Sequence, residues 1–151
     1  MEVPYLPYEV LRQKAEASLD MCHPSRAIPI PIEQIVELRL RMNIVPVPDL
    51  ERGFDTVPFL SRDMDDIHVD EYVSERNIGR YHFSLAHEVA HRILHESIYR
   101  SFAFNSIPEW RTLQAEIPPR EYQYFETQAN NFAGLVLVPA CRLRESFDEA
   151  R

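Results

Sequence analysis

Three histidines recur every four residues in one stretch of the sequence, and a glutamate directly follows the first of them. These residues are His87, Glu88, His91 and His95. On an α-helix, residues four apart lie on the same face about one turn apart, so the rings of His87 and His91 can hold one metal ion from the same side. Glu88 projects beside the pair and can reach a water at the ion. This pattern is typical of zinc hydrolases, provided that it lies on a helix.

A catalytic zinc ion takes three protein ligands and keeps one open position, so a third ligand is needed. His95 lies about 80° around the helix from His87 and about 12 Å along its axis, which is too far for one ion to contact all three rings. A third histidine of the metzincin kind would stand at position 97, but that residue is Ser97. The remaining candidates are acids further along the chain, namely Glu109, Glu116, Glu121 and Glu126.

Among these acids, Glu126 alone begins a convincing helix face. Ala129 and Ala133 leave room for a close contact between helices, and Asn130 lies one turn beyond Glu126. The amide of Asn130 can orient a ligand histidine from behind. His95 is expected to pack or hydrogen-bond beneath the site. The alternative interpretation is that Glu126 and Asn130 are ordinary surface residues.

Two helices must carry these groups, and the apolar pattern predicts both of them. The first, the active-site helix, is expected at about residues 80–97, and the second, which carries Glu126, at about residues 121–137. Further helices are expected within residues 8–42 and short strands within residues 43–72. We therefore expect all 151 residues to form a single α+β domain. In such a domain a small twisted sheet of about three strands packs on helices.

Prolines and polar residues constrain the segments between these helices. Pro46 restricts the segment "NIVPVPDL" to an edge strand or a strand end. In the segment "DDIHVDEYV", His68 and Asp70 are expected on the face opposite the apolar residues. Either they lie near a cleft on an edge strand to which a peptide adds, or they are simply exposed, which we favour. The proline-marked segment 104–120 is interpreted as an irregular connection.

Composition indicates a folded domain and excludes several functional classes. The chain is 45% hydrophobic and includes eight Phe, seven Tyr and one Trp, which suits a packed core. The net charge is −8, and the fifteen Arg and one Lys are scattered, so direct nucleic-acid binding is not expected. No apolar run reaches the roughly 20 residues of a membrane helix, and the start does not resemble a signal peptide. Cys22 and Cys141 give no disulfide framework, which favours the cytoplasm.

Two segments resemble the ImmA/IrrE family of zinc-dependent metallopeptidases, relatives of the thermolysin-like gluzincins. The segment "RYHFSLAHEVAHRILH" is similar to the family's HExxH helix, and "FETQANNFAGLVLVP" is similar to its downstream segment with the pattern ExxAN. The likeness covers roughly residues 8–140. The matching residues are Arg80, Phe83, Ser84, Leu85, Ala86, His87, Glu88, His91 and His95 in the first segment, and Glu126, Ala129, Asn130, Phe132, Ala133 and Pro139 in the second.

The resemblance implies a zincin-like fold and a hydrolytic site. It implies a Zn²⁺ ion held by His87, His91 and Glu126, with Glu88 as the general base of peptide hydrolysis. A donor that stabilises the oxyanion of the reaction is also expected. The candidates, which the sequence does not rank, are Tyr81, His82, Tyr99 and Tyr122.

The resemblance also implies a substrate class. It suggests selective cleavage of a helix-turn-helix transcriptional repressor encoded nearby, which would relieve repression of stress-response, mobile-element or toxin–antitoxin genes. The chain shows no helix-turn-helix segment of its own, so this partner would be a separate protein. The rival hypothesis is a non-proteolytic module that binds and sequesters a regulator, with a structural or vestigial metal site. An intact Glu88 argues against this rival, because a structural site does not need a base.

Overall fold

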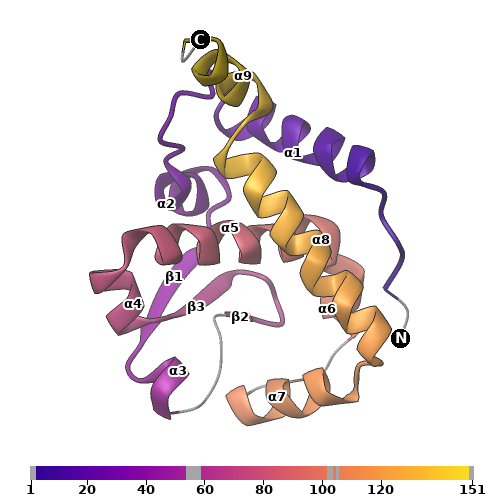
Figure 1. The fold of residues 1–151 in the computed structure, drawn as a ribbon. Coiled ribbons are helices and arrows are strands. Elements are labelled where there is room, and N and C mark those ends of the chain that lie inside the picture. The colour runs from indigo at the N-terminus through magenta and orange to yellow at the C-terminus, as the bar shows by residue number, and fades with distance from the viewer. Residues whose placement is uncertain (1–2, 54–58, 102–103, 105, 150–151) are drawn as a thin grey trace.

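Helices surround a small sheet in the computed structural model, which describes residues 3–53, 59–101, 104 and 106–149 (Figure 1). The expected α+β class is confirmed. None of the helices in the described ranges has a stretch long and apolar enough to cross a bilayer. In chain order the elements are α1 (Tyr8–Cys22), α2 (Ile32–Gln34), the π-helix η1 (Ile35–Arg39), β1 (Asn43–Val47), α3 (Leu50–Gly53), β2 (Phe59–Leu60), β3 (Asp66–Asp70), α4 (Glu71–Arg76), α5 (Ile78–Leu94), α6 (Glu96–Ser101), α7 (Ile107–Glu116), α8 (Pro119–Leu137) and α9 (Ala140–Glu149).

The sheet has the strand order β1-β3-β2, with β1 parallel and β2 antiparallel to β3. It packs beneath α5, which contacts both β2 and β3 (Figure 1). Pro46 lies in β1 at an edge of the sheet, where the missing N–H of a proline interrupts no central ladder. The strand at the other edge of the sheet is β2, which has two residues.

The edge-strand interpretation of His68 and Asp70 is wrong, because β3 is the central strand. Asp70 is buried and not exposed, whereas His68 is half-buried and lines a pocket. β3 lies between β1 and β2 and pairs with β2 at Ile67 and His68. The ring of His68 stacks on Phe59 with 4.5 Å between ring centroids. Asp70 is only 4% exposed and caps α4 by accepting a hydrogen bond from the N–H of Val73, while its second oxygen accepts from the N–H of Glu51. Strand periodicity could not reveal that β3 ends by becoming a helix cap.

The cap formed by Asp70 is expected to stabilise the fold. Asp70→Ala should lower the free energy of unfolding by about 1–3 kcal/mol, because it removes a helix cap and leaves buried N–H groups without an acceptor. Burial alone would raise the pKa of Asp70, but backbone N–H donors and the Arg80 charge outweigh it and lower the pKa. The contribution is therefore complete above the unfolded-state pKa of about 3.9 and is lost as the pH falls through the lower folded-state value.

Denaturant unfolding of wild type and Asp70→Ala at neutral and acidic pH tests this contribution. The exposed Asp65→Ala is the matched control and should change the unfolding free energy by less than about 0.5 kcal/mol. The assignment would be contradicted if the difference between wild type and Asp70→Ala persists unchanged at a pH far below the unfolded-state pKa of about 3.9.

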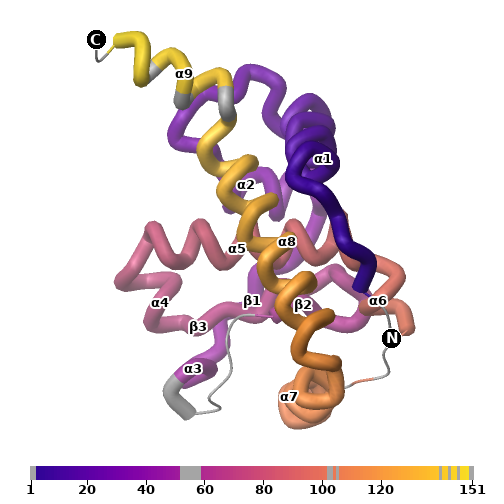
Figure 2. The backbone as a smooth tube through the Cα atoms, turned by 45° about the vertical axis from the view of Figure 1, so that its right-hand side comes forward, coloured from indigo at the N-terminus to yellow at the C-terminus, as the bar shows by residue number. Residues whose placement is uncertain are grey.

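The longest helices, α5 and α8, cross each other at the centre of the molecule (Figure 1). Buried small side chains on both of them, Ala86 and Ala90 on α5 and Ala129 and Ala133 on α8, let the backbones approach closely. The side chain of Asn77 caps α5 by accepting from a backbone N–H, so this helix begins two residues before the expected residue 80. It ends at Leu94, three residues before the expected residue 97, and α6 begins at Glu96. Helix α1 lies along α8 and buries Leu11, Ala15 and Leu19 (Figure 2).

The segment expected to be an irregular connection contains a helix instead. Residues Ile107–Glu116 form α7, whose side-chain cap is Ser106, which accepts from the N–H of Glu109. Pro108 lies in the first turn of this helix, where its missing N–H would have no intrahelical partner anyway. Pro108 thus marks the start of a helix within the segment interpreted as irregular. The helix brings Trp110 into the core.

Candidate metal centre

Three electron-pair donors converge where α5 crosses α8. His87 Nε2 lies 3.1 Å from His91 Nε2 and 3.1 Å from Glu126 Oε2, and His91 Nε2 lies 3.5 Å from Glu126 Oε1. In a tetrahedral zinc site with bonds of about 2.0–2.1 Å, neighbouring ligand atoms are about 3.3 Å apart. The three residues therefore fit one face of such a site. The side chain of Glu126 is 31% exposed, so the centre opens to solvent on its side.

The outer nitrogens of both imidazoles are engaged by other side chains. His87 Nδ1 lies 2.8 Å from Asn130 Oδ1, so the ring donates its Nδ1–H to that amide oxygen. His91 Nδ1 lies 2.9 Å from His95 Nδ1 on the buried side. Burial lowers the pKa of His91 to about 3, so this ring is neutral. With the protons on Nδ1, the lone pairs of the two Nε2 atoms face each other and the carboxylate.

Lone pairs that point at one place repel one another, so a cation between them would stabilise this arrangement. Burial alone would raise the pKa of Glu126, but hydrogen bonds with His87 and His91 outweigh it and hold the pKa well below its usual range. Burial alone would lower the pKa of His87, but the Glu126 and Glu88 carboxylates outweigh it and raise the pKa. A proton on His87 can thus occupy the place where a metal ion would bind. Metal binding at this centre is expected to release that proton.

Glu88 lies close to the two histidines and forms with them a group that could hold a metal ion. One of its carboxylate oxygens lies within 4.8 Å of ligand nitrogens of both His87 and His91. The carboxylate accepts a hydrogen bond from the N–H of Leu60 in β2, and burial raises the pKa of Glu88 to about 8. Its Oε2 atom is buried and has no hydrogen-bond partner among the described residues. Since buried carboxylate oxygens are normally satisfied, this atom is available to a water or a substrate group.

His95 is the cap residue of α5 and lies behind His91, on the side away from Glu126. Its other nitrogen, Nε2, lies 2.8 Å from Oε1 of Gln128, a residue that the sequence analysis did not single out. Burial lowers the pKa of His95, so this ring is also neutral. The signal that could have found Gln128 is its position three residues after Phe125 and four before Phe132, on the apolar face of the helix. On that face of a helix, a polar side chain is buried and needs a partner.

A pocket of about 230 Å³ opens onto this centre. The other downstream acids, Glu109, Glu116 and Glu121, are not among its lining residues. One tyrosine and one tryptophan are among them. The lining residues are Phe59, Arg80, Phe83, Ser84, His87, Glu88, His91, Tyr99, Trp110, Gln114, Glu126 and Asn130.

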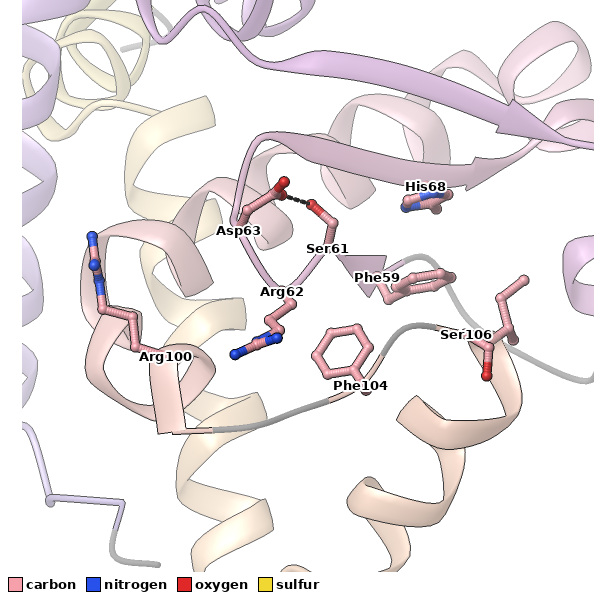
Figure 3. A pocket seen from close by; sticks show the side chains of 9 residues that line it. Phe59, Ser61, Arg62, Asp63, His68, Arg100, Phe104 and Ser106 are labelled. Carbon is pink, nitrogen blue, oxygen red and sulfur yellow. Dashed lines mark hydrogen bonds between the residues drawn. The ribbon is translucent and has the colours of Figure 1, made fainter.

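Phe59 also lines a larger pocket, of about 660 Å³, which Figure 3 shows. His68 stacks on Phe59 at its wall, and Phe104 and Arg62 lie on the opposite side (Figure 3). Asp63 is held by the hydroxyl of Ser61 at 2.6 Å.

Comparison with known proteins identifies one family. The family model described as the IrrE N-terminal-like domain, Peptidase_M78, matches residues 53–151, which is more than half of the chain. The match contains both motif segments and every residue of the centre described above. It does not include residues 8–52, for which the likeness to the family stays a prediction. No curated protein and no solved structure matches the chain.

Proposed function

We propose, because the chain belongs to the peptidase family of the IrrE N-terminal-like domain, that it is a zinc-dependent endopeptidase of narrow specificity. The resemblance to the ImmA/IrrE family is confirmed by this membership. We assign His87, His91 and Glu126 as zinc ligands and Glu88 as the general base. Asn130 and His95 are assigned as partners that orient the ligand histidines. The proposal treats the chain as one metallopeptidase-like domain.

The convergence of three lone pairs carries this proposal. Two imidazole nitrogens and a carboxylate are the donor set of many catalytic zinc sites, and three protein ligands leave a fourth position open. A structural site would instead be closed by a fourth protein ligand. The unpartnered oxygen of Glu88 lies beside the centre, where an enzyme needs a base and a structural site does not.

The residues of the chain divide the chemistry of peptide hydrolysis among them. Bound zinc supplies a Lewis acid that polarises the scissile carbonyl and acidifies water at the site. Glu88 takes the proton from the attacking water and later gives it to the departing amine. The N–H of Leu60 holds the Glu88 carboxylate in place during both transfers. Arg80, Phe83 and Phe59 line the approach to the centre and limit what can enter.

Tyr99 is the donor that we assign to the oxyanion of the reaction. Its ring is buried and stacked between Trp110 and Phe125, with ring centroids 5.4 Å and 6.0 Å away. The residue also lines the pocket of the centre. The phenol is protonated at neutral pH and can donate.

The other three candidates lack this combination of features. Tyr81 is hydrogen-bonded to Glu33. His82 lines a different pocket, beside the same Glu33. Tyr122 is not among the lining residues of the metal pocket.

Tyr99→Phe is expected to lower kcat by about 10²–10³-fold, because one donor to the oxyanion is lost. KM and zinc content should change little, since the ring remains and Tyr99 is not one of the assigned ligands. Tyr122→Phe is the matched control and should keep kcat within about threefold of wild type, the range of a change outside the oxyanion site. Steady-state kinetics on the cleaved partner give both parameters. A loss of zinc in Tyr99→Phe, or an equal loss of kcat in Tyr122→Phe, would contradict the assignment.

The proposed substrate is a helix-turn-helix repressor, and cleavage would relieve the repression that it exerts. Such a substrate would place the reaction in the cytoplasm. The acidic chain, with a net charge of −8, has electrostatic complementarity to a basic DNA-binding protein. The larger pocket, which Phe59 also lines, offers space for a substrate segment beyond the scissile bond.

Co-expression with the repressor encoded nearest to the gene tests the proposal. Intact-mass analysis should find two repressor fragments that sum to the parent plus one water, and a zinc chelator should prevent their formation. A stable complex of the two proteins with no cleavage, in the presence of zinc, would favour the sequestering module instead.

A further inference from the structure

A chain of hydrogen bonds runs from His91 through two buried side chains to the N-terminal segment. His91 Nδ1 lies 2.9 Å from His95 Nδ1, and His95 Nε2 lies 2.8 Å from Gln128 Oε1. Gln128 then donates its Nε2–H to the carbonyl of Pro4 at 2.7 Å, 124 residues away in sequence. His95 and Gln128 are 0% and 4% exposed, so these bonds are formed within the protein interior.

The positions of the protons along this chain follow from its far end. A backbone carbonyl can only accept, so the atom of Gln128 that faces Pro4 is the NH₂ group, and the atom that faces His95 is the amide oxygen. An amide oxygen also only accepts, so His95 carries its proton on Nε2. The neutral His95 ring then has a lone pair on Nδ1, which accepts the Nδ1–H of His91. Consequently the lone pair of His91 is on Nε2, the atom that faces Glu126.

We propose that Gln128 is a positioning residue that sets the tautomer of His91 through His95 and thereby keeps His91 Nε2 ready to bind the metal ion. The inference rests on the proposed function, because it deepens the role of the same centre. Without the acceptor of Gln128, His95 can carry its proton on Nδ1. His91 would then accept at Nδ1 and hold its own proton on Nε2, where it blocks the ligand atom. A partner behind a ligand histidine fixes tautomer and ring orientation in this way at many metal sites.

The N-terminal segment supports this arrangement by holding the Pro4 carbonyl in position. Val3 is buried, and the ring of Tyr5 meets the ring of Tyr124 on α8 edge-on, with 5.7 Å between centroids. The segment before α1 therefore descends beside α8, as Figure 2 shows. Both neighbours of Pro4 thus have contacts that fix the acceptor of Gln128.

Two substitutions of Gln128 separate the proposed role from simple packing. Gln128→Leu removes the acceptor at similar volume and is expected to weaken zinc binding by about 10–100-fold. Gln128→Glu keeps an acceptor for the Nε2–H of His95, although it loses the donor to Pro4. It should therefore keep the zinc dissociation constant within about threefold of wild type, since a carboxylate behind a histidine is a common support of zinc sites.

Equilibrium competition of the full chain with a chelator of known zinc affinity measures both effects. The matched control is Gln123→Leu, an exposed glutamine on the same helix, which should leave the affinity unchanged. Zinc affinity in Gln128→Leu equal to that of wild type would overturn the proposal. So would an equal loss in Gln128→Leu and Gln128→Glu, because the acceptor would then not be the property that matters.

Nitrogen-15 NMR of the imidazoles in the zinc-free wild type tests the proton positions without any variant. The expected result is a proton on Nε2 of His95 and on Nδ1 of His91. A His95 ring protonated on Nδ1 would overturn the proposal, even if Gln128→Leu does not fold. If the tautomers are as expected but wild type binds no zinc, the proposed function fails while the tautomer assignment stands.

Discussion

Cleavage of the protein substrate is expected to fall by about 10²–10⁴-fold in Glu88→Gln, the range typical of the loss of a general base. An amide cannot take the proton of the attacking water, although it has nearly the same shape as the carboxylate. Zinc content should remain at the wild-type level, because the proposal assigns Glu88 as the base and not as a ligand. The substrate should still bind, so the variant is expected to trap the complex. Fragment formation followed over time, together with metal analysis of the same sample, measures all three properties.

The matched control for Glu88 is Glu96→Gln. Glu96 is an exposed carboxylate that pairs with Arg100 on α6, away from the centre. This variant should cleave at the wild-type rate. Undiminished cleavage by Glu88→Gln would contradict its role as the base, and loss of zinc from Glu88→Gln would show instead that it is a ligand.

Glu126→Ala is expected to weaken zinc binding by more than about 100-fold. A loss of about 100-fold is the upper range for removing a residue that only supports a ligand from behind. The substitution removes the only negatively charged member of the three converging groups. His87 also loses one of the two carboxylates that raise its pKa. Two histidines one helical turn apart bind zinc more weakly than a complete set of three ligands.

Metal analysis of the purified, tag-free variants measures this loss. Wild type is expected to hold about one zinc per chain, the stoichiometry of a catalytic site, and Glu126→Ala much less under the same dialysis. The control is Glu121→Ala, which changes an acid on the same helix that does not line the pocket. Full zinc retention in Glu126→Ala, with loss in Glu121→Ala, would transfer the role of third ligand to Glu121.

The parts of the molecule that follow a regular period were predictable from the sequence. Helical spacing indicated α5 and α8, and the small residues Ala129 and Ala133 indicated that α8 packs closely on another helix. The side of α8 that carries Glu126 and Asn130 could therefore be expected to face the histidines. The distances of 2.8–3.5 Å that join these residues required the structure.

The features that sequence reasoning missed depend on contacts between distant segments. Gln128 is satisfied by His95 and by the carbonyl of Pro4, and no local pattern connects residues so far apart. Asp70 looked like an exposed strand residue because strand alternation does not reveal a helix that starts at the next residue. The prolines of segment 104–120 favour an irregular connection although Pro108 opens α7, because the same residue type both ends helices and opens them.

Zinc-edge anomalous diffraction from crystals of the zinc-loaded wild type tests the central claim most directly. The expected result is one strong anomalous peak, about 2.0–2.2 Å from Nε2 of His87, Nε2 of His91 and a carboxylate oxygen of Glu126. Glu88 should lie outside bonding distance of the peak. A peak held by other residues, or none at this position after zinc has been supplied, would contradict the assignment of these three residues as the metal centre.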